Sequence, residues 1–173
     1  MYCCSLPSGA KLGMWLFLIS DFITFATLLV AYGLLRSSAP AWPHPLALIP
    51  GTVMTALLLA SSWTMAKAVQ TASRKWIFLT AGLGAGFLAL HAMEWSRLAH
   101  ESFAEPLFGA TFFTITGFHM MHVAVGVIYL TAIALRRSTQ LQLEVSALYW
   151  QFVDLVWIVI FPAIYLTSMG GQS

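Results

Sequence analysis

Ionisable side chains are scarce in this chain of 173 residues, yet four of them lie near the middle of long apolar runs. The chain has only eight Lys or Arg residues and six Asp or Glu residues. The four side chains are Asp21, His119, His122 and Asp154. A charged group at bilayer depth costs on the order of 2.5 kcal/mol or more, so such groups normally face a bundle interior, a partner subunit or a polar pathway. We therefore expect these residues to carry the function.

The spacing of these residues allows them to meet inside a bundle. His119 and His122 are three residues apart, so they share one face of a helix. At 1.5 Å per residue, Asp21 lies about 14 Å and Asp154 about 10 Å into their apolar runs, and both histidines lie near mid-depth. An acid–imidazole cluster is thus geometrically possible. The sequence equally allows separate buried groups that are hydrogen-bonded without any proton transfer.

A second pair of ionisable residues, His91 and Glu94, lies with Trp95 near the end of another apolar run. Glu94 could reach the membrane interface or pair with Arg97 one turn further on. The simpler interpretation is a partly solvated helix end.

The histidines alone are a weak signal for a bound metal. Zinc needs three or four ligands, and an HxxH pair on a helix supplies two. Haem ligation by His91 and His119 or His122 would need room for a macrocycle between two helices, but one run is rich in glycine and the flanks are crowded with Phe. There is no glycine-rich phosphate loop and no nucleophile beside a base. The sequence predicts no catalytic residue and no cofactor or metal bound by this chain, and its net charge of +2 does not suggest nucleic acid as a partner.

The composition is that of an integral membrane protein. The chain is 60% hydrophobic and 8% charged, with a mean hydropathy of +0.83, and a soluble core of this size could not bury so much apolar surface. A membrane span needs about 20 mostly apolar residues. Five runs qualify: Leu12–Leu35, Gly51–Val69, Trp76–Leu98, Thr111–Leu135 and Ala147–Ser168. With short connections, they predict an all-α protein with one antiparallel five-helix transmembrane domain at residues 12–168, between tails at 1–11 and 169–173.

The basic residues predict the orientation in the membrane. Six of them fall on the side of the N-terminus, namely Lys11, Lys67, Arg74, Lys75, Arg136 and Arg137, and two on the other side, Arg36 and Arg97. Because cytoplasmic loops carry an excess of Lys and Arg, we expect the N-terminus in the cytoplasm and the C-terminus outside.

Two further features concern packing and connections. Gly82, Gly84 and Gly86 interrupt the third run, and Gly82 with Gly86 forms a small-xxx-small pair that favours close helix contacts. The most polar stretch, Arg136–Glu144, is interpreted as a loop.

Five segments in order form a recognisable pattern. They are Gly13-Met-Trp-Leu-Phe-Leu-Ile-Ser-Asp21, Leu57-Leu-Leu-Ala-Ser-Ser62, His91-Ala-Met-Glu-Trp95, Thr116-Gly-Phe-His-Met-Met-His-Val123 and Tyr149-Trp-Gln-Phe-Val-Asp-Leu-Val-Trp157. Together they resemble subunit III of the haem–copper respiratory oxidases, in its five-helix bacterial form. The resemblance covers essentially the whole chain beyond the first ten residues.

The resemblance implies a non-catalytic subunit in the plasma membrane of a prokaryote. Such a subunit packs on subunit I, which holds the haem and copper and reduces oxygen, in a complex with subunit II and other small subunits. In this family the subunit binds structural phospholipid between its helices and supports proton uptake and the working lifetime of the catalytic subunit.

The resemblance also implies roles for particular residues. Asp21 falls where the family usually has a membrane-embedded glutamate, and Glu94 matches a glutamate of the third-span motif, so both are expected to be proton-related acids. An interhelical polar network is expected from His91, His119, His122 and Asp154. Basic residues that meet lipid headgroups are expected at Arg136 and Arg137. Asp21 is one methylene shorter than glutamate, and Gln151 replaces a common histidine, so a proton relay through these positions is weakened.

Alternatives from other classes remain open on the sequence alone. Asp21 together with Ser61-Ser62-Trp63 also resembles a subunit-III-like accessory protein of bacterial nitric oxide reductases. A membrane electron-transfer protein with histidine-ligated haem is another alternative. A free-standing transporter or channel is a third, although such proteins usually show repeats or broken helices, and here only Pro162 interrupts a span.

Overall fold

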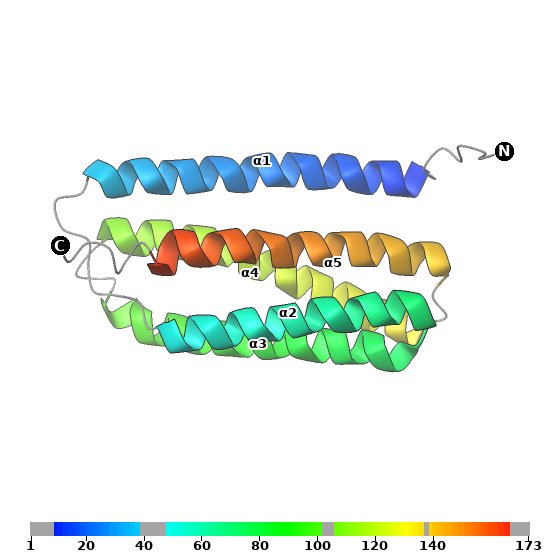
Figure 1. Ribbon diagram of the computed structural model, residues 1–173. Coiled ribbons are helices and arrows are strands. Elements are labelled where there is room, and N and C mark those ends of the chain that lie inside the picture. Colours follow the sequence, from blue (N-terminus) through cyan, green and yellow to red (C-terminus); the bar gives the residue numbers. More distant parts are fainter. Residues whose placement is uncertain (1–8, 39–47, 102–105, 137–138, 167–173) are drawn as a thin grey trace.

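The computed structural model describes residues 9–38, 48–101, 106–136 and 139–166. Within these ranges the chain forms five long helices and one short π-helix, and no strand. They are α1 (Gly9–Ser38), α2 (Leu48–Thr71), α3 (Arg74–Glu101), α4 (Pro106–Leu135), α5 (Gln140–Phe161) and η1 (Pro162–Leu166). Each long helix is long and apolar enough to cross a membrane, and consecutive helices run antiparallel (Figure 1). The predicted all-helical architecture with five candidate spans is confirmed.

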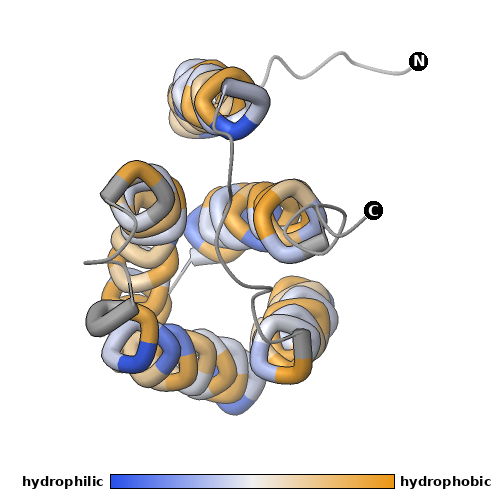
Figure 2. Tube along the Cα trace, turned by 90° about the vertical axis from the view of Figure 1, so that its left-hand side faces the viewer, coloured by the Kyte–Doolittle hydropathy of each residue, from blue (hydrophilic) through white to orange (hydrophobic). Residues whose placement is uncertain are grey.

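Helices α2 to α5 form the body of the bundle, and α1 lies to one side of it. Helix α2 packs on α3, α3 on α4, and α5 on both α2 and α4, whereas α1 contacts α5 and α4. Figure 2, which looks along the helices, shows α1 set apart from the other four and hydrophobic residues on all sides of the tubes. Helices that are apolar all round suit a lipid environment.

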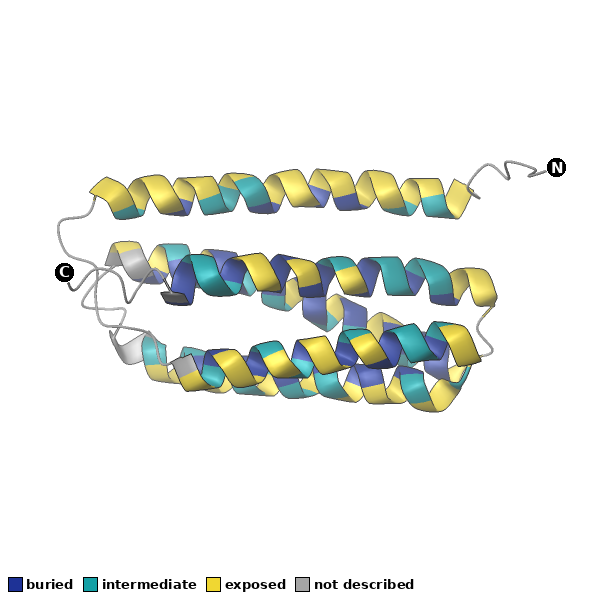
Figure 3. Cartoon of the chain, in the orientation of Figure 1, coloured by how far each residue is buried: buried dark blue, intermediate teal, exposed yellow. Residues whose placement is uncertain are grey.

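Helix α1 is buried along one narrow stripe. Its buried residues are Leu18, Asp21, Phe25 and Tyr32, and most of its remaining surface is exposed (Figure 3). The spacing of three, four and seven residues places them on one face of the helix. Asp21 thus lies within the only buried stripe that the structure shows on residues 9–38.

A buried tryptophan of α5 fixes the packing of the body. The ring of Trp150 lies between Gly84 of α3 and Gly126 of α4: an added Cβ would lie 2.5 Å from its Cη2 atom at Gly84 and 2.8 Å from its Cζ3 atom at Gly126. A Cβ on Gly82, by contrast, would meet nothing within 4 Å, and one on Gly86 only Leu57 at 3.9 Å. The close contact expected of the Gly82 and Gly86 pair is therefore made by Gly84 instead.

Helix α5 begins earlier than the hydropathy indicates. The hydroxyl of Thr139 accepts a hydrogen bond from the backbone N–H of Gln142, and the Gln142 side chain accepts one from the backbone N–H of Thr139. This capping box satisfies two N–H groups at the helix start and makes polar residues compatible with helix. The interpretation of Arg136–Glu144 as a loop is therefore wrong from Gln140 onward. Glu144 pairs with Lys11 at 2.5 Å, which joins the starts of α5 and α1.

Candidate functional site

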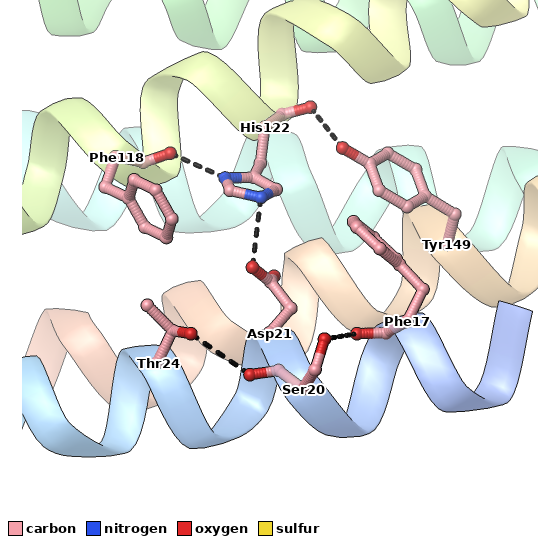
Figure 4. A network of polar contacts seen from close by, with 7 residues as sticks. All are labelled: Phe17, Ser20, Asp21, Thr24, Phe118, His122 and Tyr149. Carbon is pink, nitrogen blue, oxygen red and sulfur yellow. Dashed lines mark hydrogen bonds and ion pairs between the residues drawn. The ribbon is translucent and has the colours of Figure 1, made fainter.

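The first buried polar contact joins Asp21 of α1 to His122 of α4 (Figure 4). The Asp21 Oδ1 atom lies 3.2 Å from His122 Nε2, and His122 Nδ1 lies 2.7 Å from the carbonyl oxygen of Phe118. A carbonyl only accepts hydrogen bonds, so Nδ1 must carry a proton. The contact between Nε2 and Oδ1 then needs one further proton, held either by the imidazole or by the carboxyl group. In both arrangements the pair has no net charge, which suits its depth among apolar helices.

Aromatic rings surround this pair. The rings of Phe25 and Phe118 lie 5.5 Å and 4.7 Å from the His122 ring, and the Tyr149 hydroxyl donates to the His122 backbone carbonyl at 2.9 Å. The nearby hydroxyls of Ser20 and Thr24 donate to carbonyls of their own helix. Within the described residues, Asp21 Oδ2 has no hydrogen-bond partner. His122 is thus the side chain that holds Asp21.

The second contact joins Asp154 of α5 to α2. The hydroxyl of Ser62 donates to Asp154 Oδ2. Ser61 lies beside it, donating to the Leu58 carbonyl at 2.7 Å and accepting from Trp150 Nε1 at 2.9 Å. The possible cluster of four ionisable groups is therefore divided: Asp154 faces the serines of α2, and Asp21 faces His122.

The third contact joins Glu94 of α3 to η1. The Tyr165 hydroxyl donates to Glu94 Oε2 at 2.5 Å, and both residues are buried. The interpretation of Glu94 as a partly solvated helix end is therefore wrong. The sequence alone does not indicate Tyr165 as the partner of Glu94, because a tyrosine near the end of an apolar run is equally typical of a membrane-interface anchor.

His91 and His119 contact aromatic rings rather than polar groups. The His119 ring stacks on Trp157 with centroids 5.1 Å apart, and the His91 ring stacks on Phe87 at 5.5 Å. The Trp157 and His91 rings also meet edge to face, with centroids 5.5 Å apart. Neither ring has a hydrogen-bond partner among the residues that the structure describes. The two histidines link α3, α4 and α5 through ring packing.

Two remaining predictions concern metals and headgroups. In the described part of the chain, no group of three or more His, Cys, Asp or Glu side chains could hold a metal ion. Arg136 follows the end of α4 and is exposed, whereas Arg137 lies outside the described residues.

Removing the Tyr165 hydroxyl tests whether the Glu94 contact stabilises the bundle. We expect Tyr165→Phe to lower the free energy of unfolding by about 1 kcal/mol, because it removes the donor and keeps the ring. Denaturant unfolding in mild detergent measures this. Tyr129→Phe, on the exposed side of α4, is the matched control and should change nothing. Equal stability of the two variants would mean that the Glu94 contact adds no stability.

Each of the three buried acids therefore joins a different pair of elements: α1 to α4, α2 to α5, and α3 to η1. Five apolar helices long enough to span a membrane define a multi-pass membrane protein. Its buried acids pair with side chains of other helices of the same chain.

The particular family follows from comparison with known proteins. The family described as cytochrome c oxidase subunit III matches residues 2–169, and the chain belongs to this family. Quinol oxidase subunit 3 of Bacillus subtilis (strain 168) is 34% identical over 92% of this chain and 88% of its own length. Cytochrome c oxidase subunit 3 of the same organism is 33% identical, over 92% and 87%. That of Synechocystis sp. is 35% identical, over 92% and 76%.

These comparisons confirm the prediction of a non-catalytic subunit III of haem–copper oxidases, a family whose haem and copper lie in other subunits. The relatives named here are all oxidase subunits, which favours the oxidase over the nitric oxide reductase alternative. Five helices able to span a membrane and bacterial relatives of this kind indicate a multi-pass protein of the plasma membrane.

Proposed function

We propose that this chain stabilises the catalytic subunit I of a prokaryotic terminal oxidase, together with subunit II and smaller subunits, and supports proton uptake by that subunit. Its described basic residues support a cytoplasmic N-terminus, since the end where α1 starts carries more of them than the other end. They are Lys11, Lys67, Arg74, Lys75 and Arg136 at that end, against Arg36 and Arg97.

The observation that carries the proton-related part is the Asp21–His122 contact. Its two side chains share one proton at bilayer depth, between Nε2 and Oδ1 that lie 3.2 Å apart. A proton held in this way can move between the two groups without creating a net charge in the pair. Asp21 is therefore proposed as the membrane-embedded acid that aids proton uptake. The pair also fastens α1, which has few other buried residues.

Replacing Asp21 by asparagine separates these two roles. The asparagine amide can still donate to His122 Nε2, so we expect Asp21→Asn to leave assembly of the complex largely intact. Because asparagine has no carboxyl group to share the proton, proton uptake or the number of turnovers before inactivation should fall by about twofold. A twofold change in rate corresponds to less than ~0.5 kcal/mol in the activation free energy. Both are measured on the purified complex in vesicles.

Asp154→Asn is the control, because it makes the same chemical change at the contact with the α2 serines. It should leave proton uptake unchanged. If the Asp21→Asn complex fails to assemble, Asp21 is structural and the proton-related role is wrong.

Phospholipid is proposed as a further partner of the chain. The exposed Arg136 at the end of α4, with Arg137 beside it in the sequence, would contact anionic headgroups at the cytoplasmic surface.

A further inference from the structure

The turn between α2 and α3 concentrates basic residues in a small space. Helix α2 ends at Thr71 and α3 begins at Arg74. Ala72 takes a left-handed backbone conformation with φ of 47°, and the Trp76 N–H bonds the Ser73 carbonyl at 3.2 Å. This tight turn places the last two turns of α2 beside the first turn of α3. Three basic residues lie there: Lys67, Arg74 and Lys75.

No acidic side chain compensates these charges. Among the described residues, none forms an ion pair with Lys67, Arg74 or Lys75, whereas Lys11 at the same end of the bundle is paired with Glu144. The first turn of α3 contains no acidic residue. Arg74 and Lys75 thus stand at the positive end of a helix dipole, where cations are unfavourable. The turn carries a local excess of positive charge that an anion would relieve.

Two tryptophans, Trp63 of α2 and Trp76 of α3, lie next to these basic residues. The Lys67 ammonium is 5.7 Å from the ring centroid of Trp63, and the Trp63 and Trp76 rings meet edge to face with centroids 5.5 Å apart. Trp63 is 57% exposed. Indole rings prefer the boundary between headgroups and acyl chains. About one helical turn further from the α2–α3 turn, Leu59 of α2 and Leu79 of α3 are exposed.

The surface therefore changes from cationic to aromatic to aliphatic over a few turns of α2 and α3. That order matches the order of groups in a phospholipid: phosphate, glycerol backbone and acyl chain. A zwitterionic headgroup would bring its own ammonium group next to three cations. The described carboxylate at this end of the bundle, Glu144, is already paired with Lys11. An anionic headgroup brings only the charge that the turn lacks.

We propose that the α2–α3 hairpin binds one anionic glycerophospholipid, with its phosphate among Lys67, Arg74 and Lys75 and an acyl chain along Trp63 and Leu59. The residues of this site belong to α2 and α3, and they do not include Arg136 at the end of α4.

Photo-crosslinking tests the site directly. The intact complex is reconstituted into nanodiscs with phosphatidylglycerol or phosphatidylcholine that carries a photoactivatable acyl chain, and labelled peptides are identified by mass spectrometry. In the wild type we expect residues 59–79 to be labelled at least about tenfold more with phosphatidylglycerol. Each removed basic charge should lower this preference about fivefold, so Lys67→Gln with Lys75→Gln should nearly abolish it.

The matched control is Arg36→Gln with Arg97→Gln, which removes two charges at the other end of the bundle and should leave the preference unchanged. In the wild type, raising the salt from about 0.05 M to 0.5 M should also weaken the preference, because salt screens exposed charges. This second measurement needs no variant to fold. Equal labelling by the two lipids in the wild type, or an unchanged preference in the Lys67 and Lys75 variant, would overturn the proposal.

Discussion

Replacing Gly84 with valine should destabilise the bundle by about 2–3 kcal/mol, as overpacking of a filled core does. A Cβ at this position would lie 2.5 Å from Trp150 Cη2 and 2.8 Å from Val127 Cγ2. The Trp150 ring has little freedom to retreat, because its opposite edge lies against Gly126 and its Nε1 donates to Ser61. The change would therefore disturb contacts of α5 with α2, α3 and α4 at once.

Gly82→Val is the matched control for this variant. Gly82 lies on the same helix two residues away, and a Cβ there meets nothing within 4 Å. Both variants introduce the same β-branched side chain, so they share any effect of helix propensity. The fluorescently tagged chain is heated in mild detergent, and the folded fraction is followed by size-exclusion chromatography. Equal losses from both variants would contradict the packing role assigned to Gly84.

Replacing Asp154 with leucine should lower the free energy of unfolding by about 1–2 kcal/mol. The Ser62 hydroxyl would lose its acceptor on α5, and a larger apolar side chain would be forced against it. Interhelical hydrogen bonds in membranes contribute about 0.6 kcal/mol on average and at most about 1.7 kcal/mol, and overpacking adds to the loss. Because α5 is central to the body, the subunit should also be retained less well in the complex.

Asp154→Asn separates the hydrogen bond from the charge, since its amide oxygen can still accept from Ser62. Retention of the subunit in detergent and denaturant unfolding are compared for the two variants. We expect the asparagine variant to remain close to the wild type. If the leucine variant were retained equally well, Asp154 would not fasten α5 to α2.

The five helices could be predicted because a membrane span must be long and apolar, and both properties depend only on consecutive residues of the sequence. The residues at which the helices begin and end are harder to predict. The start of α5 contains the polar residues Gln140, Gln142 and Glu144. Their hydropathy is typical of a loop, but they are helical because Thr139 caps the helix. Capping energy is local and side-chain specific, so an average over a window hides it.

The choice of packing glycine could not be made from sequence. Gly82, Gly84 and Gly86 occupy two faces of one helix, and only the positions of α4 and α5 decide which face is covered. The same reason explains why α1 lies apart from α2. Hydropathy gives the length of each span but does not specify its neighbours, because every face is apolar.

The buried polar residues were predicted one by one, but their partners were not. The cost of burying a polar group singles out Asp21, His122 and Asp154 in the sequence. Which groups meet depends on contacts across 92 to 101 residues of chain, such as Ser62 with Asp154 and Asp21 with His122. His91 and His119 were expected to join an interhelical polar network, but in the structure their rings stack on Phe87 and Trp157. No spacing rule for hydrogen bonds predicts such stacking. Their functional roles remain predictions.

We infer that this chain is a subunit without redox centres, fastened by its own buried acids and imidazoles, in a complex with a haem–copper partner. The decisive measurement is affinity purification of the tagged chain from native membranes. It is combined with mass spectrometry of the co-purified polypeptides and with visible spectra before and after the subunits are separated. We predict a partner that retains haem and copper and a separated chain without visible absorption. Haem absorption that stays with this chain, or the absence of a haem–copper partner, would contradict the claim.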